Sequence, residues 1–363
     1  MSKRFLTAAA GSLALFIGAT NAQAAVLQPL TSFGGDGYLS PGEGPFPATP
    51  DSNQRGFAYN PTNNHLYVVS RTGSLSVPIL HGDTGAQIGT LNTTGISGGT
   101  FAANMIRVAD DGAIYATNLV TSTNTTTGAL KVYRWADETS APTVVYSGDV
   151  GLAAARFGDT LDVRGSGLNT QILLGQGSNA AGATNFAVLS TADGNTFTPQ
   201  VFNPAGVANG DFRLGIAFGN GNTIYGKQPG QTNLRLVGFD PTAGTATLVG
   251  TNTTVPISLT GIDYDPVLDV IGGAFTGNTT TAGSHDARLF EERNFTDLVQ
   301  TSEMDFPTNF ANSNGASATA IGGGRMYVLI TNNGIAAYTI VPEPGVIGLL
   351  SLGGVTLLAR RRR

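Results

Sequence analysis

Residues 214–249 read LGIAFGNGNTIYGKQPGQTNLRLVGFDPTAGTATLV, and this stretch decides the fold. It contains four short apolar segments separated by polar sequence. The first two are joined by Gly219-Asn220-Gly221-Asn222, and the last two by Asp240-Pro241-Thr242-Ala243-Gly244. Turns of this composition between short apolar runs indicate β-hairpins. The stretch therefore predicts four consecutive antiparallel strands.

The same unit recurs along the chain. An apolar second strand returns six times, with a spacing of roughly 50 residues. Four short strands in each unit of this length describe one blade of a β-propeller. We therefore expect an all-β, six-bladed β-propeller. The second strands of the six units lie at residues 66–69, 114–116, 172–174, 224–226, 270–272 and 326–329.

The sixth unit lacks a fourth strand, because residues 335–340 are followed directly by sequence of another kind. Residues 26–33 offer a strand near the other end of the chain. We expect this strand to complete the last blade, since closing the ring hides an exposed sheet edge. The loop-rich residues 34–54 could hold further strands and make seven blades. The alternatives are a β-solenoid, which the irregular spacing disfavours, and a β-sandwich, which the repeat disfavours.

Composition narrows the chemistry. The 363 residues include 50 glycines and no cysteine, and only 12 % are charged. This composition is typical of a turn-rich β protein, and it excludes disulfides, cysteine nucleophiles and thiolate metal sites. The three histidines show no zinc-binding spacing. The formal charge of −5 becomes about −11 without the basic residues of the two termini, which disfavours nucleic acid as a partner.

The first 24 residues have the pattern of a secretory signal peptide. Lys3 and Arg4 precede an apolar run, and Ala22-Gln23-Ala24 supplies a small-x-small cleavage site. We expect export through the general secretion machinery, with Ala25 as the first residue of the mature chain.

The C-terminal segment has three parts in a fixed order. Pro342-Glu343-Pro344 presents an extended segment. The apolar residues 345–359 follow, and the chain ends in Arg360, Arg361, Arg362 and Arg363. As a helix the apolar run would span about 22 Å of a hydrocarbon core of about 30 Å. The arginines would stop translocation and remain cytoplasmic.

This tail resembles the PEP-CTERM sorting signal of Gram-negative bacteria. The resemblance implies an inner-membrane precursor, processing by an exosortase near Pro-Glu-Pro, and release to or attachment at the cell surface. It also implies a link to exopolysaccharide and biofilm. The expected organisation is a signal peptide at 1–24, a propeller domain at 25–340 and the sorting signal with its transmembrane helix at 341–363.

The innermost strands supply the candidate binding residues. Aligning the repeats places Ala58, Arg107, Asp162, Ala217, Asp263 and Thr319 at equivalent positions. Small residues are expected near the propeller axis, and Arg107, Asp162 and Asp263 break that rule. These three could bind a sugar, a cation or another polar ligand at the tunnel mouth. The alternative is an ion-pair network that holds the blades together.

These observations predict a non-enzymatic surface or matrix scaffold that binds exopolysaccharide and carries no cofactor. One alternative is a polysaccharide hydrolase or lyase with Asp162 and Asp263 as its acid and base. Another is a calcium-dependent adhesin, although Asp83, Asp193 and Asp240 are expected to cap hairpin turns. Serine-based catalysis with a histidine lacks a Gly-x-Ser-x-Gly motif, and the histidines are expected in surface positions or turns.

Overall fold

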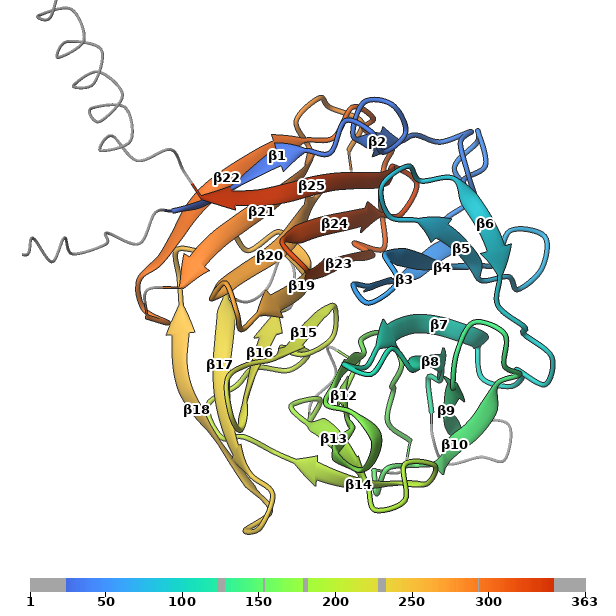
Figure 1. Cartoon of the computed structure of the whole chain (residues 1–363). Coiled ribbons are helices and arrows are strands. Elements are labelled where there is room, and N and C mark those ends of the chain that lie inside the picture. Colours follow the sequence, from blue (N-terminus) through green and yellow to red (C-terminus); the bar gives the residue numbers. More distant parts are fainter. Residues whose placement is uncertain are drawn as a thin grey trace, which may run out of the picture. The chain divides into compact units, whose positions relative to one another are not determined.

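The computed structural model describes residues 24–122, 128–152, 154–178, 182–227, 233–277, 279–292 and 294–342. Residues Ala25–Pro342 form one compact unit. In it, six antiparallel sheets are arranged as blades around a ring (Figure 1), so the prediction of a six-bladed β-propeller is confirmed. The described residues contain no helix long and apolar enough to cross a membrane.

The first five blades each contain four consecutive strands. Blade 1 is β3(Gln54–Asn60), β4(His65–Ser70), β5(Pro78–His81) and β6(Gln87–Thr90). Blade 2 is β7(Phe101–Val108), β8(Ile114–Leu119), β9(Leu130–Trp135) and β10(Thr143–Gly148). Blade 3 is β11(Asp162–Arg164), β12(Gln171–Gly175), β13(Phe186–Thr191) and β14(Phe197–Phe202), with a 3₁₀ turn at Gly167–Asn169. Blade 4 is β15(Gly215–Phe218), β16(Thr223–Lys227), β17(Leu234–Asp240) and β18(Thr245–Asn252). Blade 5 is β19(Leu259–Asp265), β20(Val270–Thr276), β21(His285–Glu292) and β22(Leu298–Asp305).

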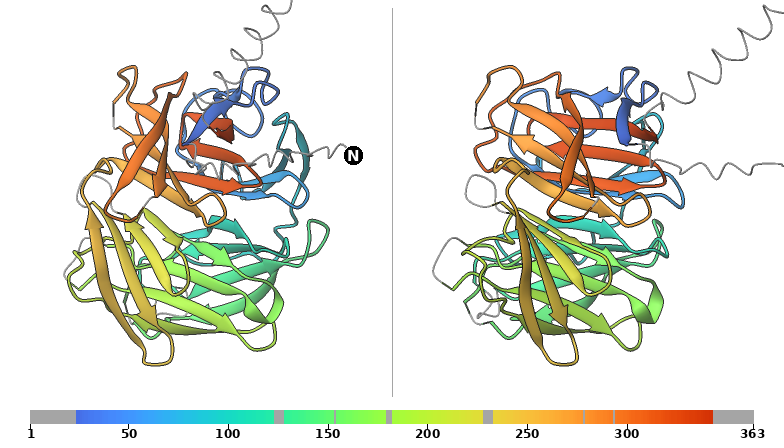
Figure 2. Two further views of the ribbon diagram at one scale, coloured as in Figure 1. Left: turned by 60° about the vertical axis from the view of Figure 1, so that its left-hand side comes forward. Right: turned by 90° about the vertical axis from the view of Figure 1, so that its left-hand side faces the viewer.

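Blade 6 is assembled from both ends of the unit. From the inner to the outer edge it contains β23(Ser317–Gly322), β24(Arg325–Ile330), β25(Gly334–Pro342) and β1(Ala25–Pro29). The register pairs Ala25 with Pro342 and Leu27 with Ile340. Figure 2 shows the N-terminal strand lying beside the C-terminal strands. The predicted closure of the ring by the N-terminal strand is therefore confirmed.

The stretch that could have held a seventh blade belongs to blade 6. It contains β2(Tyr38–Leu39), which pairs with β25. Phe33, just before this stretch, and Phe46, within it, are buried and anchor it by apolar contact. Burial of these aromatic side chains explains why a long connection stays on the propeller without forming a blade of its own.

Burial falls from the axis outward. Every residue of β8 is buried, whereas the outermost strand β18 alternates between exposed and partly buried positions. Strands covered on both faces read as continuous apolar runs, and outer strands with one solvated face alternate. The inner strands of neighbouring blades contact one another around the ring.

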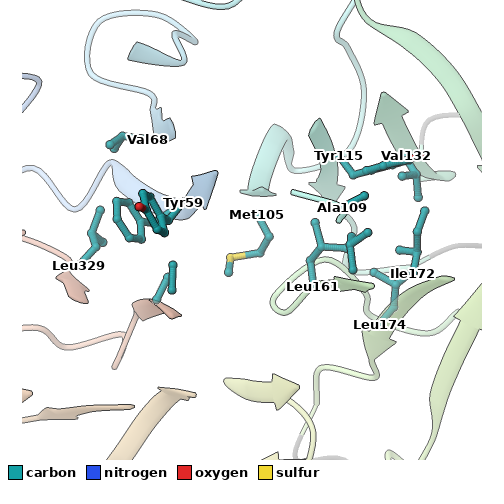
Figure 3. Packing of buried hydrophobic residues seen from close by; sticks show 14 of the residues in the cluster. Tyr59, Val68, Met105, Ala109, Tyr115, Val132, Leu161, Ile172, Leu174 and Leu329 are labelled. Atoms are coloured by element: carbon teal, nitrogen blue, oxygen red, sulfur yellow. The ribbon is translucent and has the colours of Figure 1, made fainter. Parts of the chain in front are cut away.

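Apolar side chains between the blades form the core. Tyr59 of blade 1 lies beside Leu329 of blade 6, and Tyr115 of blade 2 lies toward Ile172 and Leu174 of blade 3 (Figure 3). Apolar side chains thus fill the space between these neighbouring blades, and the ring brings the ends of the inner strands to one mouth.

Candidate functional site

A cavity of about 700 Å³ opens where each inner strand turns into the second strand of its blade. We call it the mouth cavity. All six blades contribute to its wall, so the ring itself creates it. Its lining residues are drawn from 58–62, 107–110, 162–169, 218–221, 263–267 and 320–323.

Arg107, Asp162 and Asp263 all line the mouth cavity, as the repeat alignment predicts. They come from β7, β11 and β19, the inner strands of blades 2, 3 and 5. Arg107 and Asp162 are buried, and Asp263 is partly buried. The inward position of these strands explains why three charged side chains meet in so apolar a ring.

Each of the three side chains also links its blade to a neighbour. Arg107 donates through one terminal nitrogen to the carbonyl of Phe57, at 2.7 Å. Asp162 Oδ2 accepts from the backbone N–H of Phe218, at 2.7 Å. Asp263 Oδ2 accepts from the N–H of Ile321, also at 2.7 Å. The blade-linking alternative is therefore present in the geometry alongside the open cavity.

The Nε atom of Arg107 makes no hydrogen bond to the described residues. This atom lies 3.7 Å from Asp162 Oδ1, which is an ion pair beyond hydrogen-bond distance. This Nε is buried and has no hydrogen-bond partner within the described part of the chain. Arg107 therefore leaves one hydrogen bond unmade at the wall of the mouth cavity.

Burial changes the proton affinity of both carboxylates. Desolvation by the surrounding protein raises the pKa of Asp263 to about 7; Arg107 opposes this shift and the negative charge of Asp162 adds to it. Desolvation also raises the pKa of Asp162, against the effects of Arg107 and two backbone N–H groups. A carboxyl that titrates near neutral pH can exchange a proton with a ligand.

The alignment is wrong for the sixth blade. Ala320, not Thr319, pairs with Tyr327 and lines the mouth cavity, while Thr319 is fully buried. The shift by one residue turns every side chain to the other face of the strand. Blade 4 differs as well, because Phe218 rather than Ala217 lines the cavity.

The alignment also missed further charged groups of the mouth cavity, namely Asp110, Arg164 and Asp265. Arg164 donates to the carbonyl of Gly221 at 2.5 Å and lies over the ring of Phe218. Asp265 accepts from the N–H groups that follow it in its own turn. These residues end the inner strands or begin the turns after them, so extending the repeat comparison past the strands would have found them.

A second, smaller cavity of about 310 Å³ lies between blades 1 and 2. Glu138 is its central acceptor. One carboxylate oxygen accepts from His65 Nδ1 at 2.7 Å, Tyr67 Oη at 2.7 Å and Asn63 Nδ2 at 3.0 Å. Glu138 lies more than 70 positions after its three partners, and no motif or repeat in the sequence relates it to them. The cluster could therefore not be predicted from the sequence.

The histidines differ from expectation in one case. His285 is fully buried in β21, where Nε2 lies 2.8 Å from the carbonyl of Phe310 and Nδ1 accepts from the N–H of Gly277. Placement in a surface position or turn is therefore wrong for His285. Both ring nitrogens are occupied by backbone groups, so this histidine stabilises a loop.

The described residues contain no group of three His, Cys, Asp or Glu side chains that could hold a metal ion. Two of the suspected calcium turns use their carboxylates locally: Asp193 and Asp240 accept backbone N–H groups two and three residues ahead. Asp83 instead pairs with Arg325 of blade 6 at 2.5 Å.

The processing signals fall at the limits of the described chain. Ala24, Ala25 and Pro342 are described, whereas Ala22, Glu343, Pro344 and the four C-terminal arginines lie outside the described residues. Val341 and Pro342 belong to β25, so the last strand continues two residues past the predicted end of the propeller.

Comparison with known proteins gives one family match. The model of a "Domain of unknown function (DUF4623)" matches residues 67–258. No curated protein matches the chain.

Three solved structures share the fold at low sequence identity. A DUF4623 family protein from Bacteroides eggerthii has a TM-score of 0.58 and 16% identity, with 80% of this chain and 72% of that one covered. A luciferin-regenerating enzyme has a TM-score of 0.51 and 12% identity, with 89% and 99% covered. A gluconolactonase from Xanthomonas campestris has a TM-score of 0.51 and 14% identity, with 88% and 98% covered. At these identities the likeness concerns the fold alone.

Proposed function

We propose that this chain, which belongs to the DUF4623 family of unknown function, is an exported scaffold that binds polysaccharide at the cell surface or in the extracellular matrix. The mouth cavity is the proposed binding site, with Arg107, Asp162 and Asp263 as ligand contacts. The protein acts without chemistry of its own in this proposal.

The observation that carries the proposal is the mouth cavity, whose wall holds the guanidinium of Arg107 between two carboxylates. A cavity of about 700 Å³ is large enough for one or more sugar residues. The Arg107 guanidinium offers N–H donors and the two carboxylates offer acceptors, so the lining can hydrogen-bond both the oxygen and the hydrogen atoms of hydroxyl groups. Loops around the rim supply further backbone groups of the kind that recognise polar ligands.

The proposed location depends on the sequence at the two ends. Lys3, Arg4 and the Ala22-Gln23-Ala24 site support export, and Pro342-Glu343-Pro344 with the final arginines supports sorting by an exosortase. The compact unit begins at Ala25, the residue that the cleavage pattern makes the first of the mature chain. We propose a membrane-anchored precursor whose propeller is later displayed at the surface or released.

A second candidate function is a polysaccharide hydrolase or lyase that uses the same cavity. The observation in its favour is the pKa of Asp263, which is raised to about 7 and would let this carboxyl serve as a general acid or base near neutral pH. Asp162 would be its partner. Both carboxylates already accept inter-blade N–H bonds through one oxygen, and this is why scaffolding is the first choice.

The test is co-sedimentation of the full chain with the extracellular polysaccharide of the producing cells, with and without a calcium chelator. The scaffold proposal predicts saturable binding that competes with soluble fragments and leaves the polymer length unchanged. Shortening of the polymer, abolished in Asp263→Asn, would replace it with the enzyme. Binding lost on chelation would point to the calcium-dependent adhesin, and no binding would overturn the proposal.

A further inference from the structure

We infer that the mouth cavity selects a sugar that carries a free amino group over one that carries a carboxylate. This inference rests on the proposed sugar-binding function and names the ligand class of the same site. It is carried by the charges that line the cavity and by how those charges are already engaged.

Carboxylates outnumber cations in the cavity wall. The lining contains four acidic and two basic side chains. A concave site lined mainly by one sign of charge concentrates the field of that sign, because its walls have low polarisability. Asp263, whose pKa is raised to about 7, is only partly ionised near neutral pH. An ammonium group beside it would favour the ionised form and be attracted to it, whereas a uronate would be repelled by every ionised carboxylate of the lining. The charged lining residues are Asp110, Asp162, Asp263, Asp265, Arg107 and Arg164.

The two arginines are poorly placed to recruit an anion. Arg164 donates to Gln171 Oε1 at 2.9 Å and to backbone carbonyls of the blade 4 turn, and it covers the ring of Phe218. Arg107 donates to Phe57 and lies beside Asp162. A carboxylate could take over the engaged guanidinium nitrogens only by breaking bonds that the protein already makes, which would leave those carbonyls unsatisfied. The remaining nitrogen, Arg107 Nε, is buried beside Asp162, whose negative charge would repel a second carboxylate.

The carboxylates retain room for donors. Each ionised carboxylate can accept about four hydrogen bonds. Asp110 uses Oδ2 for the N–H of Gly165, at 3.0 Å, and Asp263 uses Oδ2 for Ile321. An ammonium group with three donors can add to these bonds without displacing them. A hydroxyl group on the same sugar can accept from the Arg107 guanidinium, which also lines the cavity.

The test compares three β-linked tetramers by calorimetry with the full chain near neutral pH. They are a glucosamine tetramer, its N-acetylated counterpart and a uronic acid tetramer. Acetylation removes the charge and keeps the sugar ring, so the first two differ chiefly at the amine. We expect the glucosamine tetramer to bind about tenfold more tightly than the acetylated one, since one charge near a partly buried carboxylate is worth at least that factor. The uronate should bind most weakly.

Two variants locate the effect. Asp263→Asn and Asp110→Asn each remove one charge from the lining, and an amide oxygen can still accept the structural N–H bonds. Each should lower the preference for the amine, by about threefold or more. Asp297→Asn is the matched control, because Asp297 is exposed and does not line the cavity. Using two lining variants protects the test against misfolding of either one.

The possible outcomes distinguish a failure of amine selection from a failure of the proposed sugar-binding function. Equal binding of the first two tetramers, or tighter binding of the uronate, would overturn the inference and leave sugar binding standing. An equal loss in Asp297→Asn would also overturn it, because net charge would then be responsible. If none of the three tetramers binds while the cells' own polysaccharide does, amine selection is wrong; if that polymer also fails, the proposed function is wrong.

Discussion

Different nitrogen atoms of Arg107 contact two neighbouring blades. A terminal nitrogen ties blade 2 to the carbonyl of Phe57 in blade 1, while Nε faces Asp162 across 3.7 Å. Removing one member of a buried charge pair leaves the other charge uncompensated. The resulting loss of stability is larger than the net stability that the intact pair contributes. The residue is therefore needed both for the ring and for the site.

We expect Arg107→Met to lower the free energy of unfolding by about 3 kcal/mol, because Asp162 and Asp263 lose their nearest cation. Adding Asp162→Asn should restore part of this loss, since the uncompensated charge is then gone. Urea unfolding of the two single variants and the double variant measures the coupling. Arg134→Met, which removes a partly exposed partner of Tyr115, is the control. Strict additivity of Arg107→Met and Asp162→Asn would contradict the pairing.

Asp263 predicts a particular pH dependence. Its pKa is raised to about 7 in the folded protein, whereas an unfolded aspartate titrates near about 4. Between these values the native state binds more protons than the unfolded state, so stability falls as pH rises and levels off above the folded pKa. The slope from this one group is at most about 1.4 kcal/mol per pH unit.

Asp263→Asn should remove that slope, because the amide does not titrate in this range. The measurement is the difference in free energy of unfolding between the parent and the variant at several pH values from acid to neutral. The difference should change in favour of the variant as pH rises. A constant difference across the range would mean that Asp263 is ionised throughout.

At the scale of elements, the five residues of β1 supply the fourth strand of blade 6. β1 pairs along its whole length with β25, and Leu27 also donates its N–H to Ser302 of blade 5 at 2.8 Å. These contacts join residues more than 270 positions apart, so forming them carries the entropy cost of closing a very long loop. The pairing of β1 and β25 thus holds the ring shut.

The absence of native cysteine makes this pairing easy to test. Val26 and Val341 are register partners, so Val26→Cys with Val341→Cys should form a disulfide on oxidation. The cross-link should raise the free energy of unfolding by about 4 kcal/mol at most. Gel mobility and thermal unfolding are the measurements. Val26→Cys with Thr339→Cys places the thiols two positions out of register, and efficient cross-linking of that pair would contradict the pairing.

Local sequence was sufficient to predict the strands and the blades, because a polar turn between two short apolar runs determines a hairpin within a few residues. The repeat also predicted that Arg107, Asp162 and Asp263 lie close together, since it places each of them on an inner strand. It failed where register depends on the turn: the two-residue turn at Gly323-Gly324 sets Ala320 rather than Thr319 opposite Tyr327. It also failed for Glu138 and His65, which only the assembled ring brings together.

At the scale of the whole molecule, the two ends of the propeller coincide with the two predicted processing signals. Ala25 begins the first strand and pairs with Pro342, which ends the last. All strands of the described chain therefore lie between the predicted cleavage site before Ala25 and Glu343. Processing at both ends could then remove terminal segments without removing any strand, which is what display of an intact propeller requires.

This arrangement predicts a sharp difference between two C-terminal truncations. A chain that ends at Pro342 keeps all five β1 partners, so its thermal midpoint should match that of the full chain. A chain that ends at Ala337 loses every register partner of residues 25–29, from Tyr338 to Pro342. It exposes Leu27 and an unpaired strand edge, and we expect a midpoint lower by several degrees, with aggregation on heating. Circular dichroism and light scattering measure both effects. Equal midpoints for the two truncations would show that the ring is stable without this closure, and the ends would then have to be assigned another role.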